Sequence, residues 1–165
     1  MNTNLPSNIP GRARLLTGAA IVLATLLVTP ARATVRWETL EAIHRIENPM
    51  NTERPGPCGE LGAYQFRERT WRMHTTLPFN RALDRRASDA VAVQHYEWLK
   101  DRLAKAGFEI SPYNIGLAWN GGITSVVHGR VRPSTRDYAE RVRNIAETLR
   151  RPVDAPPVTL VASSR

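Results

Sequence analysis

The chain has 165 residues, of which 42% are hydrophobic and 23% are charged, and its formal net charge is +8. This length and apolar content predict one compact domain with a sizeable core. The 10 glycines and 12 prolines follow no short period, which excludes a collagen-like chain. The single cysteine, Cys58, excludes a disulfide within the chain and a cysteine-rich zinc module.

The first 33 residues have the pattern of a secretory signal peptide. Arg12 and Arg14 precede an uncharged, mostly apolar run over 15–28, and residues 31–33 have the A-x-A pattern of a cleavage site. The run is short for a membrane span, which needs about 20 residues, although an uncleaved N-terminal anchor is the alternative. We therefore expect a signal peptide over 1–33, export to the periplasm or the exterior, and no stable membrane insertion after cleavage.

The positive charge of an exported chain bears on its partners. Such a charge favours polyanions and anionic surfaces. Because nucleic acid is scarce outside the cytoplasm, we expect the partner to be a bacterial wall with its anionic polymers, and no nucleic acid.

The first predicted helix carries an apolar face. Four residues recur on it at helical spacing: Trp37, Leu40, Ile43 and Glu47. The helix ends before Pro49, because proline disfavours helical geometry in the preceding residue. A loop over 48–61, a short extended or turn segment over 62–66 and a helical turn over 70–74 are predicted to follow. We expect three tryptophans to belong to the core: Trp37, Trp71 and Trp98.

The rest of the chain is also predicted to be helical. Four helices are expected at the following positions: 88–106, 113–119, 123–128 and 134–149. Gly107 stops the first of them. Ser134 is the expected N-cap of the last, in a variant capping box with aspartate in place of glutamate. Residues 151–165 are rich in proline and lack aromatic side chains, which predicts a disordered tail after a mainly α-helical domain over 34–150.

Glu47 is an unusual residue for an apolar helix face. Burial of a carboxylate is costly unless the group is paired or neutralised. Desolvation raises the pKa of a carboxyl group, and a raised pKa suits a general acid at neutral pH. The alternative is that Glu47 lies at a frayed helix end and points into water.

Four short motifs follow one another along the chain. They are AIHRIENP at 42–49, GELGAYQF at 59–66, AWNGG at 118–122 and TRDYAERV at 135–142. Together they resemble the motifs of the soluble lytic transglycosylase family, within the lysozyme-like superfamily. Glu47 precedes Gln65 by 18 residues, which is the usual interval in that family, and Thr70 follows Gln65 by five. The resemblance extends from about residue 37 to residue 149.

The resemblance implies a single compact lysozyme-like α-helical domain with a groove for the glycan strands of peptidoglycan. Members of the family cleave the β-1,4 bond between N-acetylmuramic acid and N-acetylglucosamine and form a 1,6-anhydromuramyl product. It implies Glu47 as the catalytic acid and base. It also implies Tyr138 as a hydrogen-bond partner of Glu47 or of the saccharide. The substrate-binding residues that it implies are Tyr64, Gln65, Trp119, Asn120 and Tyr138. No metal or cofactor is expected.

The chain departs from the family pattern at several positions. Asn48 stands where a serine usually follows the catalytic glutamate, and Gly56 stands where a serine usually lies near the substrate acetamido group. A neighbouring side chain, the backbone or water must then replace that serine. The Leu-Met pair before Gln65 is replaced by Ala-Tyr, and a tyrosine of the third motif by Trp119.

Two other functions remain open at this point. A lysozyme-type hydrolase would use the same site with water as nucleophile, and glycosidases of that kind usually need a second carboxylate. Goose-type lysozymes tend to carry an acid two residues after the motif glutamine, where this chain has Arg67. Glu53 and Glu60 are the remaining candidates, with solvated loop charges as the alternative. A non-catalytic glycan-binding module on the same fold is the other possibility, within a secretion or wall-remodelling complex or outside one.

Overall fold

The computed structural model describes Met1 and residues 31–150, with side chains from residue 35 onward. The described chain is mainly α-helical and contains no strand. Its elements in chain order are α1 (Ala31–Glu47), α2 (Glu68–Arg72), the 3-10 helix η1 (Phe79–Leu83), α3 (Arg85–Lys105), α4 (Pro112–Gly121), α5 (Ile123–Val127) and α6 (Pro133–Arg150). The predicted tail lies outside the described residues, as does the predicted signal peptide except for Met1 and its last three residues, which open α1. Between residues 31 and 150, no helix has the length and apolar character needed to span a bilayer.

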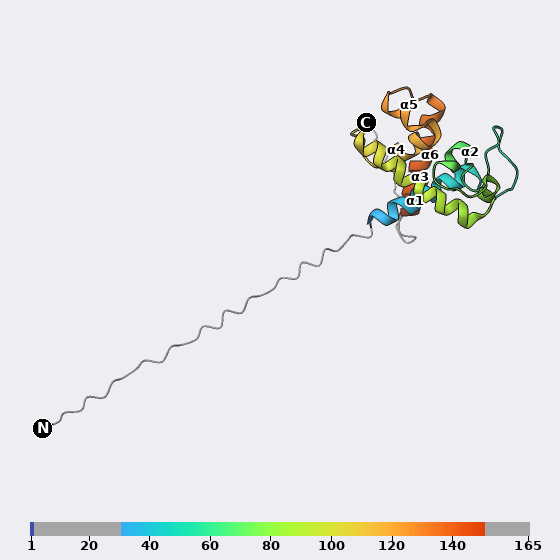
Figure 1. The fold of residues 1–165 in the computed structure, drawn as a ribbon. Helices are drawn as coiled ribbons and strands as arrows, with labels where there is room; N and C mark the ends of the chain where they lie inside the picture. The colour runs from blue at the N-terminus through green and yellow to red at the C-terminus, as the bar shows by residue number, and fades with distance from the viewer. Residues whose placement is uncertain (2–30, 151–165) are drawn as a thin grey trace, which may run out of the picture.

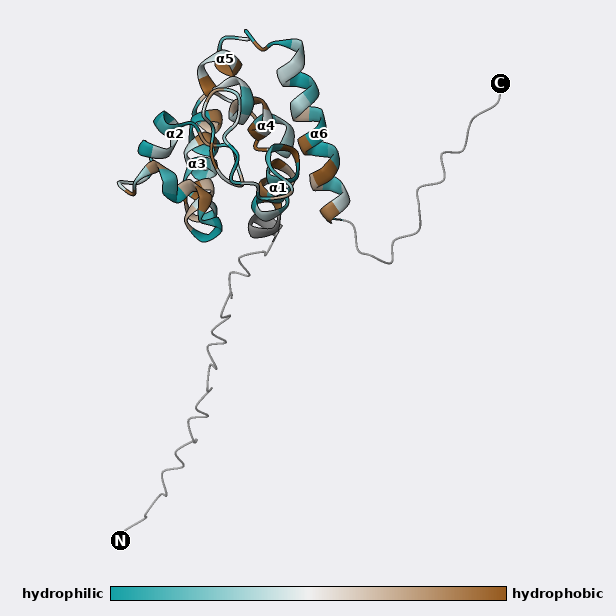
Figure 2. Cartoon of the chain, turned by 90° about the vertical axis from the view of Figure 1, so that its right-hand side faces the viewer, coloured by the Kyte–Doolittle hydropathy of each residue, from teal (hydrophilic) through white to brown (hydrophobic). Residues whose placement is uncertain are grey.

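Helices α1, α4 and α6 lie close together and form one half of the core (Figure 1). Ile115 and Ala118 of α4 are fully or almost fully buried, as are Ala139 and Val142 of α6. A Cβ atom on Gly116 would lie 3.1 Å from the Cα atom of Ala139, so the glycine permits the close approach of the two helices. Brown and teal segments alternate along α6, as expected for a helix with one buried side (Figure 2).

Helix α3 supplies the other half of the core. Its buried residues include Tyr96, Leu99 and Leu103, which recur at helical spacing as predicted. The helix begins three residues before the predicted start, because the side chain of Asp84 caps it by accepting a 3.0 Å hydrogen bond from the backbone N–H of Ala87.

A tight turn follows the loop over 48–60. The backbone N–H and carbonyl groups of Leu61 and Phe66 form two hydrogen bonds of 2.9 and 3.0 Å, which close the turn. Gly62 has a φ of +79°, and a Cβ atom there would lie 1.8 Å from the carbonyl oxygen of Ala82. Only glycine fits, because the site requires both a left-handed backbone and the absence of a side chain.

Two local predictions are wrong. Trp37 is 59% exposed, because the next two residues of α1, Glu38 and Thr39, lie on its buried side instead. Glu38 pairs there with Arg150 of α6 at 3.2 Å. Ser134 is not the N-cap of the last helix. Helix α6 begins at Pro133, a residue whose fixed φ and missing N–H suit the first helical position.

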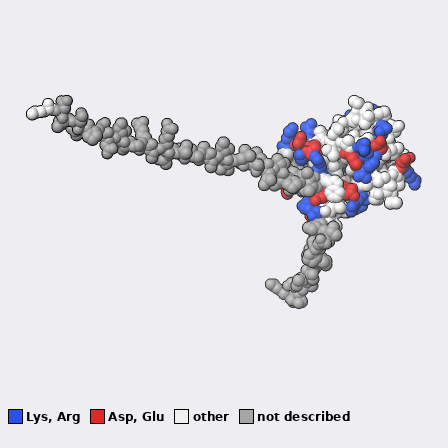
Figure 3. Space-filling view, turned by 90° about the horizontal axis from the view of Figure 1, so that it is seen from below, with Lys and Arg blue, Asp and Glu red and all other residues white. Residues whose placement is uncertain are grey.

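Acidic and basic side chains are interspersed on the face of the described domain seen in Figure 3. Most basic residues that pair do so with acidic neighbours on their own helix, as in the Arg72–Glu68 and Arg85–Asp89 pairs. On that face the positive net charge therefore forms no continuous patch.

Candidate active site

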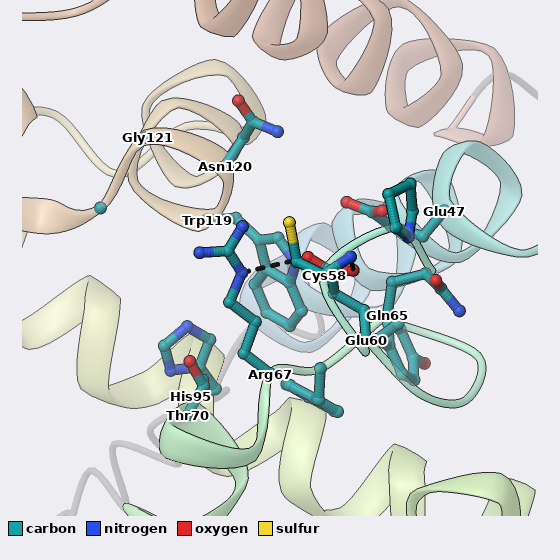
Figure 4. Close-up of a pocket in the computed structure, with 14 residues that line it drawn as sticks. Glu47, Cys58, Glu60, Gln65, Arg67, Thr70, His95, Trp119, Asn120 and Gly121 are labelled. Carbon is teal, nitrogen blue, oxygen red and sulfur yellow. Dashed lines mark hydrogen bonds and ion pairs between the residues drawn. The ribbon is translucent and has the colours of Figure 1, made fainter. Parts of the chain in front are cut away.

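A pocket of about 630 Å³ lies among the end of α1, the loop and turn over 48–67, and the end of α4. We call it the Glu47 pocket (Figure 4). Its lining residues are Glu47, Pro57, Cys58, Glu60, Tyr64, Gln65, Phe66, Arg67, Thr70, His95, Trp119, Asn120, Gly121 and Gly122. Three of the four sequence motifs therefore contribute to one cavity, although they lie far apart in the chain.

Glu47 is the last residue of α1 and is partly buried. The hydroxyl of Tyr138, a buried residue of α6, donates a 2.7 Å hydrogen bond to Oε1 of Glu47. Burial raises the pKa of Glu47 above its ordinary value, and the nearby charge of Glu60 raises it further, whereas the Tyr138 hydrogen bond opposes the rise. The carboxyl group is thus held in one orientation and biased toward its protonated form.

Glu60 is a second carboxylate in the same pocket. Burial opposes ionisation of Glu60, but hydrogen bonds from the Cys58 backbone N–H at 2.8 Å and from Nε of Arg67 at 3.1 Å outweigh it. The net effect is a pKa below the ordinary value. Glu60 is therefore not a solvated loop charge, whereas Glu53 is exposed and does not line the pocket. The pocket combines one carboxyl group biased toward protonation and one biased toward ionisation.

Asn48 has a structural role that the sequence did not reveal. Its buried side-chain amide donates to the carbonyl oxygens of Thr52 and Gly62 at 2.9 and 3.2 Å, and its Oδ1 accepts from the Thr52 N–H at 2.9 Å. These bonds attach the loop and the turn to the end of α1. A serine at this position would be too short to reach both partners.

Gly56 leaves room for two polar side chains. A Cβ atom at Gly56 would lie 2.7 Å from Oε2 of Glu60 and 2.7 Å from Oε1 of Gln65. These two side chains occupy the space that a side chain at position 56 would enter. A side chain at position 56 would therefore require Glu60 and Gln65 to move.

The two residues predicted from the second motif differ in their placement. Gln65 has a φ of +46°, which is uncommon for a residue with a side chain, and its amide donates to the Gly62 carbonyl at 3.0 Å. Tyr64 is 4% exposed, and its hydroxyl donates to Oδ1 of Asp89 at 2.8 Å. Tyr64 therefore braces the wall of the pocket against α3, whereas Gln65 presents polar atoms to the cavity.

The third motif forms the side of the pocket opposite the loop. Trp119 lies in an aromatic cluster, with ring centroids 5.7 Å from Phe66 and 6.0 Å from Tyr64. Asn120 accepts a 2.9 Å hydrogen bond at Oδ1 from the hydroxyl of Thr135, which fixes the side chain at the edge of the pocket. Glu47 and Asn120 come from different helices and face the same cavity (Figure 4).

His95 lines the pocket and was not predicted as a site residue. It is buried, its Nδ1 lies 2.9 Å from Nε2 of His74, and its ring meets the edge of Trp119 with centroids 4.9 Å apart. Burial lowers the pKa of His95 to about 3, with a smaller contribution from His74, so the ring is neutral near pH 7. The burial of His95 could have been inferred from the sequence, because His95 lies four residues before the buried Leu99 and therefore on the same side of α3.

Five of the six predicted site residues line the pocket, and the sixth, Tyr138, does not line it but hydrogen-bonds Glu47. Sequence reasoning missed Arg67 and His95 and gave Glu60 less weight than the geometry supports. Within residues 31–150, no three His, Cys, Asp or Glu side chains lie together as metal ligands would. Comparison with protein-family models, with curated proteins and with solved structures finds no match to this chain.

Proposed function

We propose that the protein is a peptidoglycan lytic transglycosylase with a lysozyme-like fold, in which the Glu47 pocket is the substrate groove. The observation that carries this proposal is the Glu47 carboxyl group at the pocket, with its pKa raised by burial and its orientation held by Tyr138. Cleavage of a glycosidic bond requires an acid that can donate a proton, and a raised pKa favours the protonated form that does so.

Glu47 serves both steps of the proposed reaction. Its carboxyl group protonates the oxygen that links N-acetylmuramic acid to N-acetylglucosamine, and the bond from that oxygen to the muramyl anomeric carbon breaks. The resulting carboxylate then takes the proton of the muramyl 6-hydroxyl, whose oxygen attacks the anomeric carbon. The product is a 1,6-anhydro sugar, water is not consumed, and Glu47 ends the cycle protonated.

The other pocket residues position the substrate in this proposal. Gln65 and Asn120 offer amide groups to the acetamido and hydroxyl groups of the sugars, and Trp119 offers an aromatic surface. Tyr64 braces the wall that carries Gln65.

A lysozyme-type hydrolase is the second candidate, and Glu60 is the observation that favours it. Many glycosidases use two carboxyl groups, and here one has a raised pKa and the other a lowered pKa. In such an enzyme Glu60 would direct a water molecule to the anomeric carbon or stabilise the positive charge that develops there.

Digestion of purified sacculi separates the candidates. A transglycosylase releases muropeptides with 1,6-anhydro ends, whereas a hydrolase releases reducing ends heavier by the mass of one water, and mass spectrometry distinguishes them. Glu47→Gln should remove activity by about 10²–10⁴-fold or more in either case. Glu60→Gln should be as severe only in a hydrolase, with the exposed Glu53→Gln as the matched control. Wild-type protein that binds sacculi and releases neither product would instead be a non-catalytic glycan-binding module.

We also propose that the protein is exported and acts in the periplasm or outside the cell. The proposal rests on the leader-like pattern of residues 1–33. N-terminal sequencing of periplasmic or secreted protein should give Thr34 as the first residue. Full-length protein in the cytoplasm would contradict the assignment.

A further inference from the structure

A second pocket, of about 360 Å³, adjoins the Glu47 pocket. The two share Arg67, Asn120 and Gly121 in their linings, so a chain bound in one can extend into the other. The second pocket also reaches Arg130 and Arg132, which belong to the connection between α5 and α6. We call it the arginine pocket after Arg67, Arg130 and Arg132.

The arginine pocket is positively charged. Three of its lining residues are arginines and none is acidic. Neither Arg130 nor Arg132 pairs with an acidic side chain anywhere between residues 31 and 150. Arg67 gives only its Nε to Glu60, so its two terminal amino groups are left for another acceptor. The positive end of the α6 dipole adds to this charge, because Ser134 at its first turn lines the same cavity.

The walls of the arginine pocket are held in place by the fold. The backbone N–H of Arg130 donates to the Ser125 carbonyl at 2.8 Å, which closes the connection after α5. The Thr135 hydroxyl donates to Asn120 at 2.9 Å, which ties the start of α6 to the end of α4. The backbone that carries the exposed Arg130 and Arg132 side chains is therefore in place before an anion enters the cavity.

The sugars of the glycan backbone carry hydroxyl and acetamido groups and do not account for three arginines. The carboxylates that accompany these sugars belong to the peptide stems, which branch from the muramyl residues. Arginine binds carboxylates with paired hydrogen bonds. A phosphodiester polymer is a poorer candidate, because it is joined through the muramyl 6-hydroxyl that the proposed reaction needs free.

We propose that the arginine pocket binds the carboxylates of a peptide stem whose glycan strand lies in the Glu47 pocket, an inference that rests on the proposed function. The protein then prefers peptide-bearing strands over bare glycan. Arg130 and Arg132 set this preference without taking part in the reaction.

The test compares three forms of one soluble glycan preparation. They are strands with their peptide stems, the same strands stripped by an amidase with the lactyl carboxylates that this frees then converted to amides, and stem-bearing strands whose carboxylates have been amidated. Affinity and kcat/KM are measured for wild type, Arg130→Gln, Arg132→Gln and the double variant. Arg86→Gln is the control, because Arg86 is exposed and lines neither pocket. Thermal unfolding checks that every variant is folded.

Wild type should bind and cleave the stem-bearing strands best and treat the stripped and amidated strands alike. Each single variant should lower affinity and kcat/KM for stem-bearing strands by about two- to fivefold, and the double variant by about tenfold, as expected for exposed ion pairs. Stripped strands should be unaffected, and the difference should shrink at high salt.

Three outcomes would overturn the inference. The first is equal affinity of wild type for all three forms. The second is a loss in the double variant that is the same for stem-bearing and stripped strands. The third is competition by polyglycerol phosphate that depends on Arg130 and Arg132 while the three glycans bind alike. Binding of stem-bearing strands through the arginines with no cleavage of any strand would support this inference and contradict the proposed function.

Discussion

The hydroxyl of Tyr138 lies 2.7 Å from Oε1 of Glu47, although 91 residues separate the two in the chain. The hydrogen bond joins the start of α6 to the end of α1. It stabilises the ionised form of Glu47 and so limits the rise in pKa that burial causes. A proton-transfer group that must lose and regain its proton in one cycle benefits from such a balance.

Removal of the Tyr138 hydroxyl should shift the pH dependence of activity upward. In Tyr138→Phe the hydrogen bond that lowers the pKa of Glu47 is lost, so the pKa rises and the basic limb of kcat/KM moves to higher pH. Turnover should fall clearly, while the free energy of unfolding should change by about 1 kcal/mol or less, the typical net contribution of a hydrogen bond. A pH–rate profile and urea unfolding measure the two effects. Near wild-type turnover with an unmoved basic limb would mean that Tyr138 contributes to packing alone and does not affect Glu47.

Neutralisation of Glu60 should shift the basic limb of kcat/KM to lower pH, opposite to the effect of Tyr138→Phe. The charge of Glu60 raises the pKa of Glu47, so Glu60→Gln lowers that pKa and moves the basic limb to lower pH. Cys58 and Arg67 donate to different oxygens of Glu60, so the glutamine can accept only one of these two hydrogen bonds, and urea unfolding checks that the variant is folded. The measurement is the pH–rate profile, with Glu53→Gln as the control whose basic limb stays in place. A basic limb that stays at its wild-type position in Glu60→Gln would show that the two carboxyl groups do not interact.

Glu47→Gln should stabilise the protein as the pH rises. Below the ordinary glutamate pKa, Glu47 holds its proton in both the folded and the unfolded chain. Above it, the unfolded chain ionises first, and wild type loses stability until the pH passes the raised pKa of the folded state. The variant avoids this loss, so its advantage in urea unfolding should grow as the pH rises above the ordinary glutamate pKa and level off once the pH passes the raised pKa of Glu47. An advantage that does not change with pH would contradict the raised pKa.

Two glycines of the second motif should differ in their tolerance of alanine. Both have a φ of +79°, but a Cβ atom at Gly62 would collide with the Ala82 carbonyl, whereas one at Gly59 would meet nothing within 4 Å. Gly59→Ala should therefore cost about 1–2 kcal/mol, for the left-handed backbone alone. Gly62→Ala should cost about 1–3 kcal/mol more, because the collision adds to the same backbone cost. Urea unfolding of the two variants measures the difference, and equal losses would refute the close contact with η1.

The helical character of the chain and the position of Glu47 could be predicted from the sequence, because both depend on local rules. Apolar spacing identifies the helices, and Pro49 stops α1 directly after the residue that becomes the candidate acid. The partnership of Tyr138 with Glu47 was also expected, but from the resemblance to a family, since spacing alone does not join distant helices.

Only the tertiary structure decided what the loop residues do. Glu60 becomes an ionised partner of Glu47 because Cys58 and Arg67 bind its carboxylate, and Asn48 ties the loop to the turn through the Gly62 carbonyl. These placements rest on hydrogen bonds between segments that meet only in the folded chain, and hydrogen bonds of this kind leave no periodic trace in a sequence. Local periodicity thus determined the helices and the site of the acid, and the packing of distant segments determined the charge and the shape of the pocket around it.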